Sequence, residues 1–274
     1  MSKYKIVFSD IDGTFIRKDH TLSEKHALAA KKLIEQKIPF VLVSARMPEG
    51  IYPITNQIGI KIPIISYSGG LVLTADEKIL YSKTIDEDSA RDMIEAIENI
   101  EPALRKRVSP NFYAGRKWYV NSIDERVQVE INTTKASVEI VPDFRKLLDK
   151  KILPNKLLLL GDDESCAILE KDLGGKFPNL HVVRSSSHIL DIMEKTVSKA
   201  TGINIMLEHF GLTAEDALAF GDNYNDREML QLVGHSVAMD NAPDEIKKLA
   251  DEVTDSNEND GVYTFLVKNG IISE

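Results

Sequence analysis

The sequence contains one cysteine, Cys166, among its 274 residues. A single thiol cannot form an internal disulfide, so a disulfide-stabilised scaffold is excluded and a reducing, cytoplasmic setting is expected. A zinc site made of cysteines is excluded as well, because such sites need several thiolates at close spacing. The six histidines show no metal-ligand spacing, and we expect none of them to hold a metal.

Basic residues are also fewer than acidic ones. Lys and Arg total 34 against 43 Asp and Glu, which gives a formal net charge of −9 at pH 7. Non-specific nucleic-acid binding requires the opposite sign, so we expect no nucleic-acid partner. An anionic small ligand would need a local site that overcomes this background, through a metal or a focused lysine.

Long apolar runs are absent too. No stretch approaches the roughly 20 apolar residues of a membrane-spanning helix, and residues 1–9 lack the apolar region of a signal peptide. We therefore expect neither a membrane span nor a targeting segment. No repeat of fixed period is present, and no coiled-coil heptad or apolar stripe indicates an oligomeric state.

In the first part of the chain, short apolar runs alternate with longer amphipathic stretches. We predict strands over residues 5–8, 40–43 and 64–67, with helices over Thr21–Gln36 and Gly50–Ile58 between them. Thr21 and Glu24 have the spacing of a capping box at the first helix start. This order is typical of a parallel sheet with helices on both faces.

The pattern becomes less regular after about residue 86 and returns near residue 188. Between them we predict helices over Ser89–Asn99 and Ser165–Leu173 and strand-like pieces at 118–120, 137–141, 156–160 and 181–183. After residue 188 we predict helices over Thr196–His209, Asp226–Leu232 and Pro243–Ala250. We predict strands over Ala217–Phe220 and Ser236–Met239 in the same part of the chain. The last segment, Glu252–Asp260, is predicted to be a solvated acidic loop.

The predicted fold class is therefore α/β. A doubly wound, Rossmann-like parallel-sheet core is formed by residues 1–85 and 188–274, and residues 86–187 form an inserted α+β cap domain. Such an insertion, of about a hundred residues, is too long for a simple connecting loop.

Polar segments follow the predicted core strands. The first strand leads into Ser9–Thr14, the second into Ser44–Arg46, and a later one into Gly221–Asp226. The carboxyl ends of parallel strands line one crevice, where ligands bind, so these remote segments should converge. We interpret Arg46 as a structural or cap-contacting residue.

Convergence would bring four aspartates into one small space: Asp10, Asp12, Asp222 and Asp226. Uncompensated carboxylates repel one another and take up protons. A bound Mg²⁺ resolves this conflict, because it accepts a few carboxylate oxygens and keeps its waters. A magnesium beside an aspartate also allows an aspartyl nucleophile to approach an anionic phosphate.

Other groups near the same strand ends are suited to holding phosphoryl oxygens. They are the hydroxyl of Ser44, the backbone amides near Gly13 and Ala45, the side chain of Asn225 and a lysine. Phosphoryl transfer depends on this kind of positioning together with charge.

These segments resemble the motifs of the haloacid dehalogenase (HAD) superfamily. The first motif is matched by Asp10–Thr14, the second by Ser44, the third by Lys199 and the fourth by Gly221–Asp226. The resemblance extends to the Cof-type branch, a sugar-phosphatase-like group with a large α/β cap, through residues 191–203, 238–242 and 259–262. It covers essentially the whole chain, with the cap least distinctive.

The resemblance implies roles for the acidic residues. Asp10 would be the nucleophile that becomes a phosphoaspartate. Asp12 would act as general acid and then general base, and would offer its backbone carbonyl to the metal. Asp10 and Asp222 would bind Mg²⁺ directly, with Asp226 supporting that site.

It also implies that the phosphoryl group is held by Ser44, Ala45, Lys199 and Asn225. Family members often have threonine-glycine where this chain has Ser44 and Ala45, a change that keeps the hydroxyl and the amide. The expected activity is Mg²⁺-dependent hydrolysis of small phosphorylated metabolites, including sugar phosphates. A phosphomutase of the same superfamily and a non-enzymatic phospho-acceptor or binding module are the alternatives.

Overall fold

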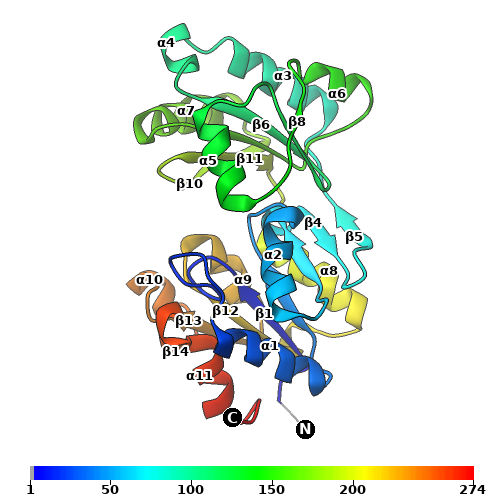
Figure 1. Cartoon of the computed structure of the whole chain (residues 1–274), viewed down its shortest axis with the longest axis vertical. Coiled ribbons are helices and arrows are strands. Elements are labelled where there is room, and N and C mark those ends of the chain that lie inside the picture. The colour runs from blue at the N-terminus through cyan, green and yellow to red at the C-terminus, as the bar shows by residue number, and fades with distance from the viewer. Residues whose placement is uncertain (1–2) are drawn as a thin grey trace. The chain divides into compact units, whose positions relative to one another are not determined.

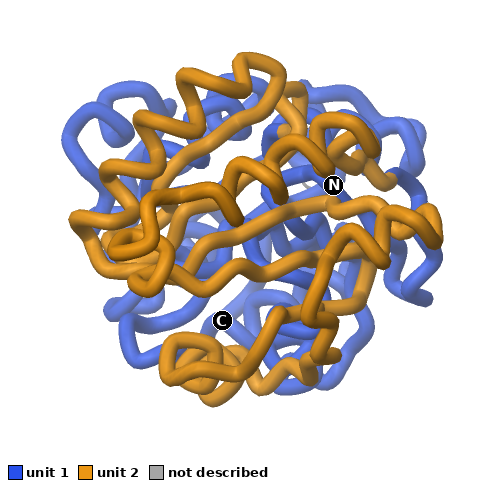
Figure 2. The backbone as a smooth tube through the Cα atoms, turned by 90° about the horizontal axis from the view of Figure 1, so that it is seen from above, with its two compact units in different colours: residues 1–81, 198–274 blue, residues 82–197 orange. Residues whose placement is uncertain are grey.

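The computed structural model describes residues 3–274, and the chain divides into two compact units. Unit 1 contains residues 1–81 and 198–274, and unit 2 contains residues 82–197 (Figure 2). The chain thus leaves unit 1 once and returns to it later. Among the helices of residues 3–274, none combines the length and the apolarity that a membrane crossing requires.

Unit 1 is built around an eight-stranded sheet (Figure 1). Its strands are β1 Ile6–Asp10, β2 Phe40–Val43, β3 Ile64–Ser66, β4 Leu71–Leu73, β5 Ile79–Ser82, β12 Ala217–Gly221, β13 His235–Met239 and β14 Glu252–Thr254. Their order is β14-β13-β12-β1-β2-β3-β4-β5. The strands from β14 to β3 run parallel, and β4 is antiparallel to β3. The predicted doubly wound core is confirmed.

Helices cover both faces of this sheet. They are α1 Glu24–Glu35, α2 Pro48–Ile58, α8 Lys199–Phe210, α9 Arg227–Leu232, α10 Asp244–Lys247 and α11 Gly261–Lys268. One buried cluster joins Phe8 of β1 and Ala219 of β12 to α8 and α9. Because strand side chains alternate between faces, Phe220 points the other way, where its ring centroid lies 5.4 Å from that of Phe265 in α11. Helix α11 packs in turn against α1.

Unit 2 is an α+β unit with a six-stranded sheet. Its strands are β6 Ser109–Ala114, β7 Lys117–Val120, β8 Glu139–Ile140, β9 Lys156–Leu160, β10 Leu180–Ser186 and β11 Ile189–Glu194. Its helices are α3 Glu87–Glu98, α4 Pro102–Arg105, α5 Glu125–Thr134, α6 Arg145–Asp149 and α7 Asp163–Lys176. The order is β10-β11-β9-β6-β7-β8, antiparallel except for the β7–β8 pair. Alternate strand residues, including Phe112 and Leu159, pack against α3 and α7.

The predicted boundary at residue 187 is wrong. Residues 189–194 form β11, which pairs with β9 and β10 in the sheet of unit 2. Leu190 and Ile192 alternate into the apolar cluster of that unit, so this strand is held there by burial as well as by hydrogen bonds. The first boundary differs by a few residues, at 82 instead of 86.

Two local predictions in unit 1 are also wrong. Helix α1 is capped by Ser23, whose Oγ accepts from the backbone N–H of His26 at 3.0 Å, while Thr21 bonds to Asp19 instead. The segment predicted as a solvated acidic loop contains β14, and Asn257 within it is buried. Its amide Nδ2 donates to the carbonyl of Ile16 at 2.8 Å, which ties the loop to the core.

Candidate active site

The candidate site lies at the carboxyl ends of neighbouring parallel strands. Strand β1 ends at Asp10, and its neighbours β12 and β2 end directly before Asp222 and Ser44. Asp10, Asp222 and Asp226 are buried, and their carboxylate oxygens lie within 4.8 Å of one another. The structure thus brings together segments that are about 200 residues apart in sequence, which is what the strand ends predict.

Lys199 joins this group from the first turn of α8. Its side chain is 0% exposed, and Nζ donates to Oδ1 of Asp226 at 2.5 Å and to Oδ1 of Asp10. The start of α8 is held close to residue 69, where a Cβ would lie 1.9 Å from the carbonyl oxygen of Ser198. Gly69 has φ +103°, so only glycine meets both requirements easily.

The charges of this cluster shift its pKa values strongly. Burial raises the pKa of Asp10 well above its ordinary value, against the opposing effect of Lys199. Burial and the charge of Asp226 raise the pKa of Asp222 to about 6. Burial alone would lower the pKa of Lys199, but Asp10 and Asp226 outweigh it and raise that pKa. Three carboxylates and one ammonium leave a deficit of positive charge.

Asp226 is fully engaged by protein donors. Its Oδ1 accepts from Lys199, and its Oδ2 accepts from the backbone N–H groups of Asp222 and Asn223 at 2.9 and 3.0 Å. Each oxygen of Asp226 thus already accepts at least one hydrogen bond from the protein. Its position therefore fits a residue that supports the Asp222 loop.

Asp10 and Asp222 are the residues that fit a hard divalent cation. Oδ1 of Asp222 accepts from the hydroxyl of Thr14 at 2.7 Å, and Oδ1 of Asp10 accepts from Lys199. The Oδ2 atoms of both make no hydrogen bond to any residue of the range 3–274. Gly13, at φ +88°, leaves room for Asp222, because a Cβ there would lie 2.2 Å from Oδ2. Two buried oxygen donors of raised pKa suit a hard cation.

Asp12 lies apart from the buried cluster. Its side chain is 45% exposed and forms a bidentate pair with Arg46, from Nε to Oδ2 at 2.8 Å and from Nη2 to Oδ1 at 2.5 Å. Nδ1 of His20 lies 3.6 Å from Oδ1. The interpretation of Arg46 as a structural or cap-contacting residue did not include this contact with Asp12. In the sequence, only the closeness of Arg46 to Ser44 indicated that it lies near the site.

The predicted phosphate-binding residues differ in burial and in whether they contact the carboxylate cluster. Ser44 is buried and its Oγ accepts from the backbone N–H of Arg46 at 3.1 Å, while Ala45 is half-buried. Lys199 lies within the carboxylate cluster. Asn225 is exposed, in the short helical turn Tyr224–Asp226, and the structure does not join its side chain to the cluster.

Two residues that sequence reasoning did not assign hold the loop after β1. Thr14 donates to Asp222, as described above. Asn241 donates from Nδ2 to the carbonyl of Gly13 at 2.8 Å, and its Oδ1 accepts from the backbone N–H of Asn257 at 3.1 Å. Both lie in segments that resemble family motifs, so position within those segments was the available signal.

Comparisons with known proteins identify the family of this chain. The family model of haloacid dehalogenase-like hydrolases matches residues 7–266. A Haemophilus influenzae protein named "Putative phosphatase" is 34% identical over 264 residues, covering 96% of this chain and 97% of its own. The crystal structure of a haloacid dehalogenase-like hydrolase from Bacteroides thetaiotaomicron has a TM-score of 0.87 at 29% identity, covering 97% of this chain and 99% of its own.

A further solved structure agrees at the level of the fold. The HAD subclass IIB sugar phosphatase BT4131 has a TM-score of 0.81 at 23% sequence identity, covering 98% of this chain and all of its own. The family match spans nearly the whole sequence, and both units are included in the structural matches. This chain therefore belongs to the haloacid dehalogenase-like hydrolase family.

Proposed function

We propose that this protein is a Mg²⁺-dependent phosphatase that hydrolyses small phosphorylated metabolites through a phosphoaspartate at Asp10. The observation that carries the proposal is the state of the Asp10 carboxylate. One of its oxygens is bonded to buried Lys199, while the other makes no hydrogen bond to a described residue, and an oxygen of this carboxylate lies within 4.8 Å of one of Asp222. Membership in a hydrolase family and the name of the Haemophilus relative support the same activity.

In this proposal one carboxylate oxygen of Asp10 attacks the phosphorus atom of the substrate. The bond from phosphorus to the ester oxygen breaks as that oxygen takes a proton from Asp12. Asp12 then accepts a proton from water, whose oxygen attacks phosphorus and breaks its bond to Asp10. Inorganic phosphate is released, and both aspartates return to their starting states.

Arg46 adds a requirement to the role of Asp12. The guanidinium of Arg46 bonds to both carboxylate oxygens of Asp12. Asp12 must therefore give up at least part of this pairing before one of its oxygens can face the leaving group. Its exposed position leaves room for such a movement.

The oxygens of Asp10 and Asp222, with the backbone carbonyl of Asp12, would hold the Mg²⁺. When bound, the metal supplies positive charge that offsets the carboxylates and the phosphate. Lys199 holds Asp10 in place and neutralises part of the cluster, and Asp226 fixes the backbone of Asp222. We assign the phosphoryl oxygens to Ser44, the amide of Ala45, Lys199 and Asn225.

We further assign substrate selection to unit 2, as a cap domain. Sugar phosphates are the first class of substrate to test, because the family resemblance points to them. A phosphomutase would return the phosphoryl group to a sugar, whereas a phosphatase releases it as inorganic phosphate. A binding module would do neither.

The test is phosphate release by purified protein over a panel of sugar phosphates, with Mg²⁺ and then with EDTA. We expect turnover only with Mg²⁺, and labelled phosphate trapped on Asp10 after rapid acid quench. Asp10→Asn should reduce release to background, while the matched control Asp172→Asn, at an exposed position on α7, should leave it unchanged. Label on another residue, or full activity in EDTA, would reject the mechanism.

A further inference from the structure

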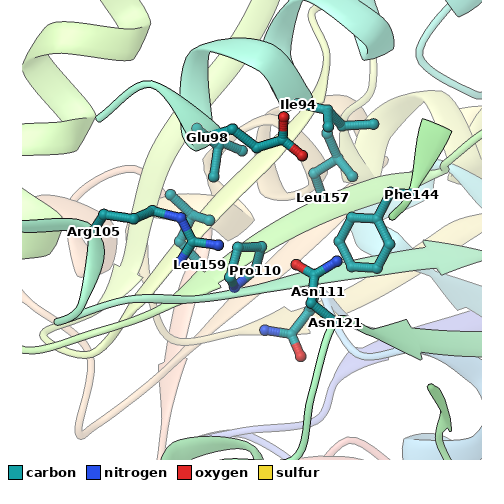
Figure 3. Close-up of a pocket in the computed structure, with 10 residues that line it drawn as sticks. Ile94, Glu98, Arg105, Pro110, Asn111, Asn121, Phe144, Leu157 and Leu159 are labelled. Carbon is teal, nitrogen blue, oxygen red and sulfur yellow. The ribbon is translucent and has the colours of Figure 1, made fainter. Parts of the chain in front are cut away.

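Unit 2 contains a polar hollow of about 190 Å³ that is built entirely from its own residues. It lies between the end of α4, the start of β6 and the segment that joins β7 to α5. An adjoining pocket, shown in Figure 3, shares Arg105, Pro110 and Asn121 with it and has apolar side chains such as Leu157 and Leu159 in its wall. Arg105 extends its guanidinium towards Pro110 in that view.

The lining of the hollow is positively charged. Three cations contribute to it, Arg105, Lys106 and Arg126, against one carboxylate, Asp124. That carboxylate is already occupied: Oδ1 accepts from the backbone N–H of Val127 at 3.0 Å, and Oδ2 accepts from Nη2 of Arg126 at 3.0 Å. Once Arg126 and Asp124 offset each other, two positive charges remain.

Those two charges have no carboxylate partner within residues 3–274. Neither Arg105 nor Lys106 lies within ion-pair distance of a carboxylate in the described part of the chain, although acidic residues outnumber basic ones by nine. The next residue, Arg107, behaves differently and bonds to both Asp162 and Glu164. Nη1 of Arg105 donates to the carbonyl of Val108 at 3.2 Å, which leaves its other donors available to a ligand.

We infer that this hollow is a binding site for a small oxyanion, namely a phosphate group. A guanidinium presents donors in a planar fork that matches phosphate oxygens, and a neighbouring ammonium adds charge. A concave site of one sign concentrates counter-ions even on a protein of the opposite net charge. The inference does not depend on the proposed phosphatase activity, because every residue of this site belongs to unit 2 and none is assigned to the catalytic cluster.

The test is a titration of the full-length protein with inorganic phosphate in EDTA, followed by the amide NMR shifts of Ser122 and Ile123. We expect saturable shifts in the wild type. Lys106→Gln, which removes no hydrogen bond seen within residues 3–274, should weaken binding roughly tenfold or more, the usual effect of losing one charge-assisted hydrogen bond. Arg105→Gln/Lys106→Gln should abolish it.

The control Lys171→Gln/Lys176→Gln removes two exposed charges from α7 in the same unit and should leave binding unchanged. A parallel titration with glycerol phosphate separates free phosphate from a phosphoester as the ligand. Equal weakening in the control would show that only net charge matters, and would overturn the inference. So would the absence of shifts at Ser122 and Ile123. Phosphatase activity is assayed separately, so failure of either proposal leaves the other open.

Discussion

Replacing Lys199 with methionine removes a positive charge from the centre of the carboxylate cluster while keeping most of the side-chain volume. The Lys199 side chain is 0% exposed and bonds to both Asp10 and Asp226. Its loss leaves two buried carboxylates close together without their cation. Removing one partner of a buried ion pair typically costs about 3–5 kcal/mol. We expect the free energy of unfolding at pH 7.5 in EDTA to fall by this amount.

A double-mutant cycle identifies the cause. Asp226→Asn removes one of the two uncompensated charges, so Lys199→Met/Asp226→Asn should be less destabilised than the sum of the single variants by about 1 kcal/mol or more. Lys171→Met, at an exposed position on α7, is the control and should change stability by no more than about 0.5 kcal/mol.

Urea unfolding of these variants at pH 5 and pH 7.5 is the assay. Without Lys199 the pKa of Asp10, which burial already raises, should rise further, so the folded protein binds protons that the unfolded chain releases. The stability lost in Lys199→Met should therefore be largest at pH 7.5 and smaller at pH 5. A loss below about 1 kcal/mol at both pH values, or strict additivity in the cycle, would refute the reasoning.

Three further changes test other parts of the site. In EDTA, the contribution of Asp222 to stability should fall by about 3 kcal/mol as pH rises from about 4 to 6, because the pKa of Asp222 is raised to about 6 from 3.8; urea curves of wild type and Asp222→Asn with the same pH dependence contradict this. Asp12→Ala should slow the first step with a sugar phosphate about 10²–10⁴-fold, yet release a burst of nitrophenolate from p-nitrophenyl phosphate and then stall; equal losses without a burst would remove Asp12 from acid–base chemistry. Gly13→Ala should weaken Mg²⁺ binding roughly 10–100-fold, because its Cβ would lie 2.2 Å from Oδ2 of Asp222; calorimetry showing unchanged affinity would oppose that.

The sequence predicts the part of the site that depends on strand order. Apolar runs such as Ile6–Phe8 can only be buried strands of a covered sheet, and parallel strands expose their carboxyl ends at one edge. Asp10 and Asp222 follow two such runs, so their meeting follows from topology without knowledge of any side-chain conformation. The family resemblance adds Lys199, whose place on a helix would otherwise indicate an ordinary exposed lysine.

Pairings that depend on side-chain conformation could not be predicted in this way. The contact between Arg46 and Asp12 depends on the side-chain rotamer of Arg46 and on the conformation of the loop that carries it. Neither produces a periodic pattern in the sequence. The second domain boundary fails for a related reason, since residues 189–194 form a mostly apolar segment that suits either unit. Only the pairing of β11 with β9 decides which sheet receives it. Long-range pairing of this kind is not encoded in local sequence.

The two proposed phosphate sites of the molecule differ in what they can bind without a metal. In the cluster of unit 1, Lys199 is outnumbered by Asp10, Asp222 and Asp226, so an incoming phosphate meets net negative charge until a cation is present. The hollow of unit 2 has the opposite balance, because the three cations in its lining outnumber its one carboxylate, Asp124. In EDTA, phosphate should therefore change the NMR shifts of the amides that line the hollow of unit 2 and leave those beside Asp10 unchanged. After Mg²⁺ is added, phosphate should change the shifts of the amides beside Asp10 as well. The difference between the two sites follows from their local charge alone, since both belong to the same chain and share its net charge.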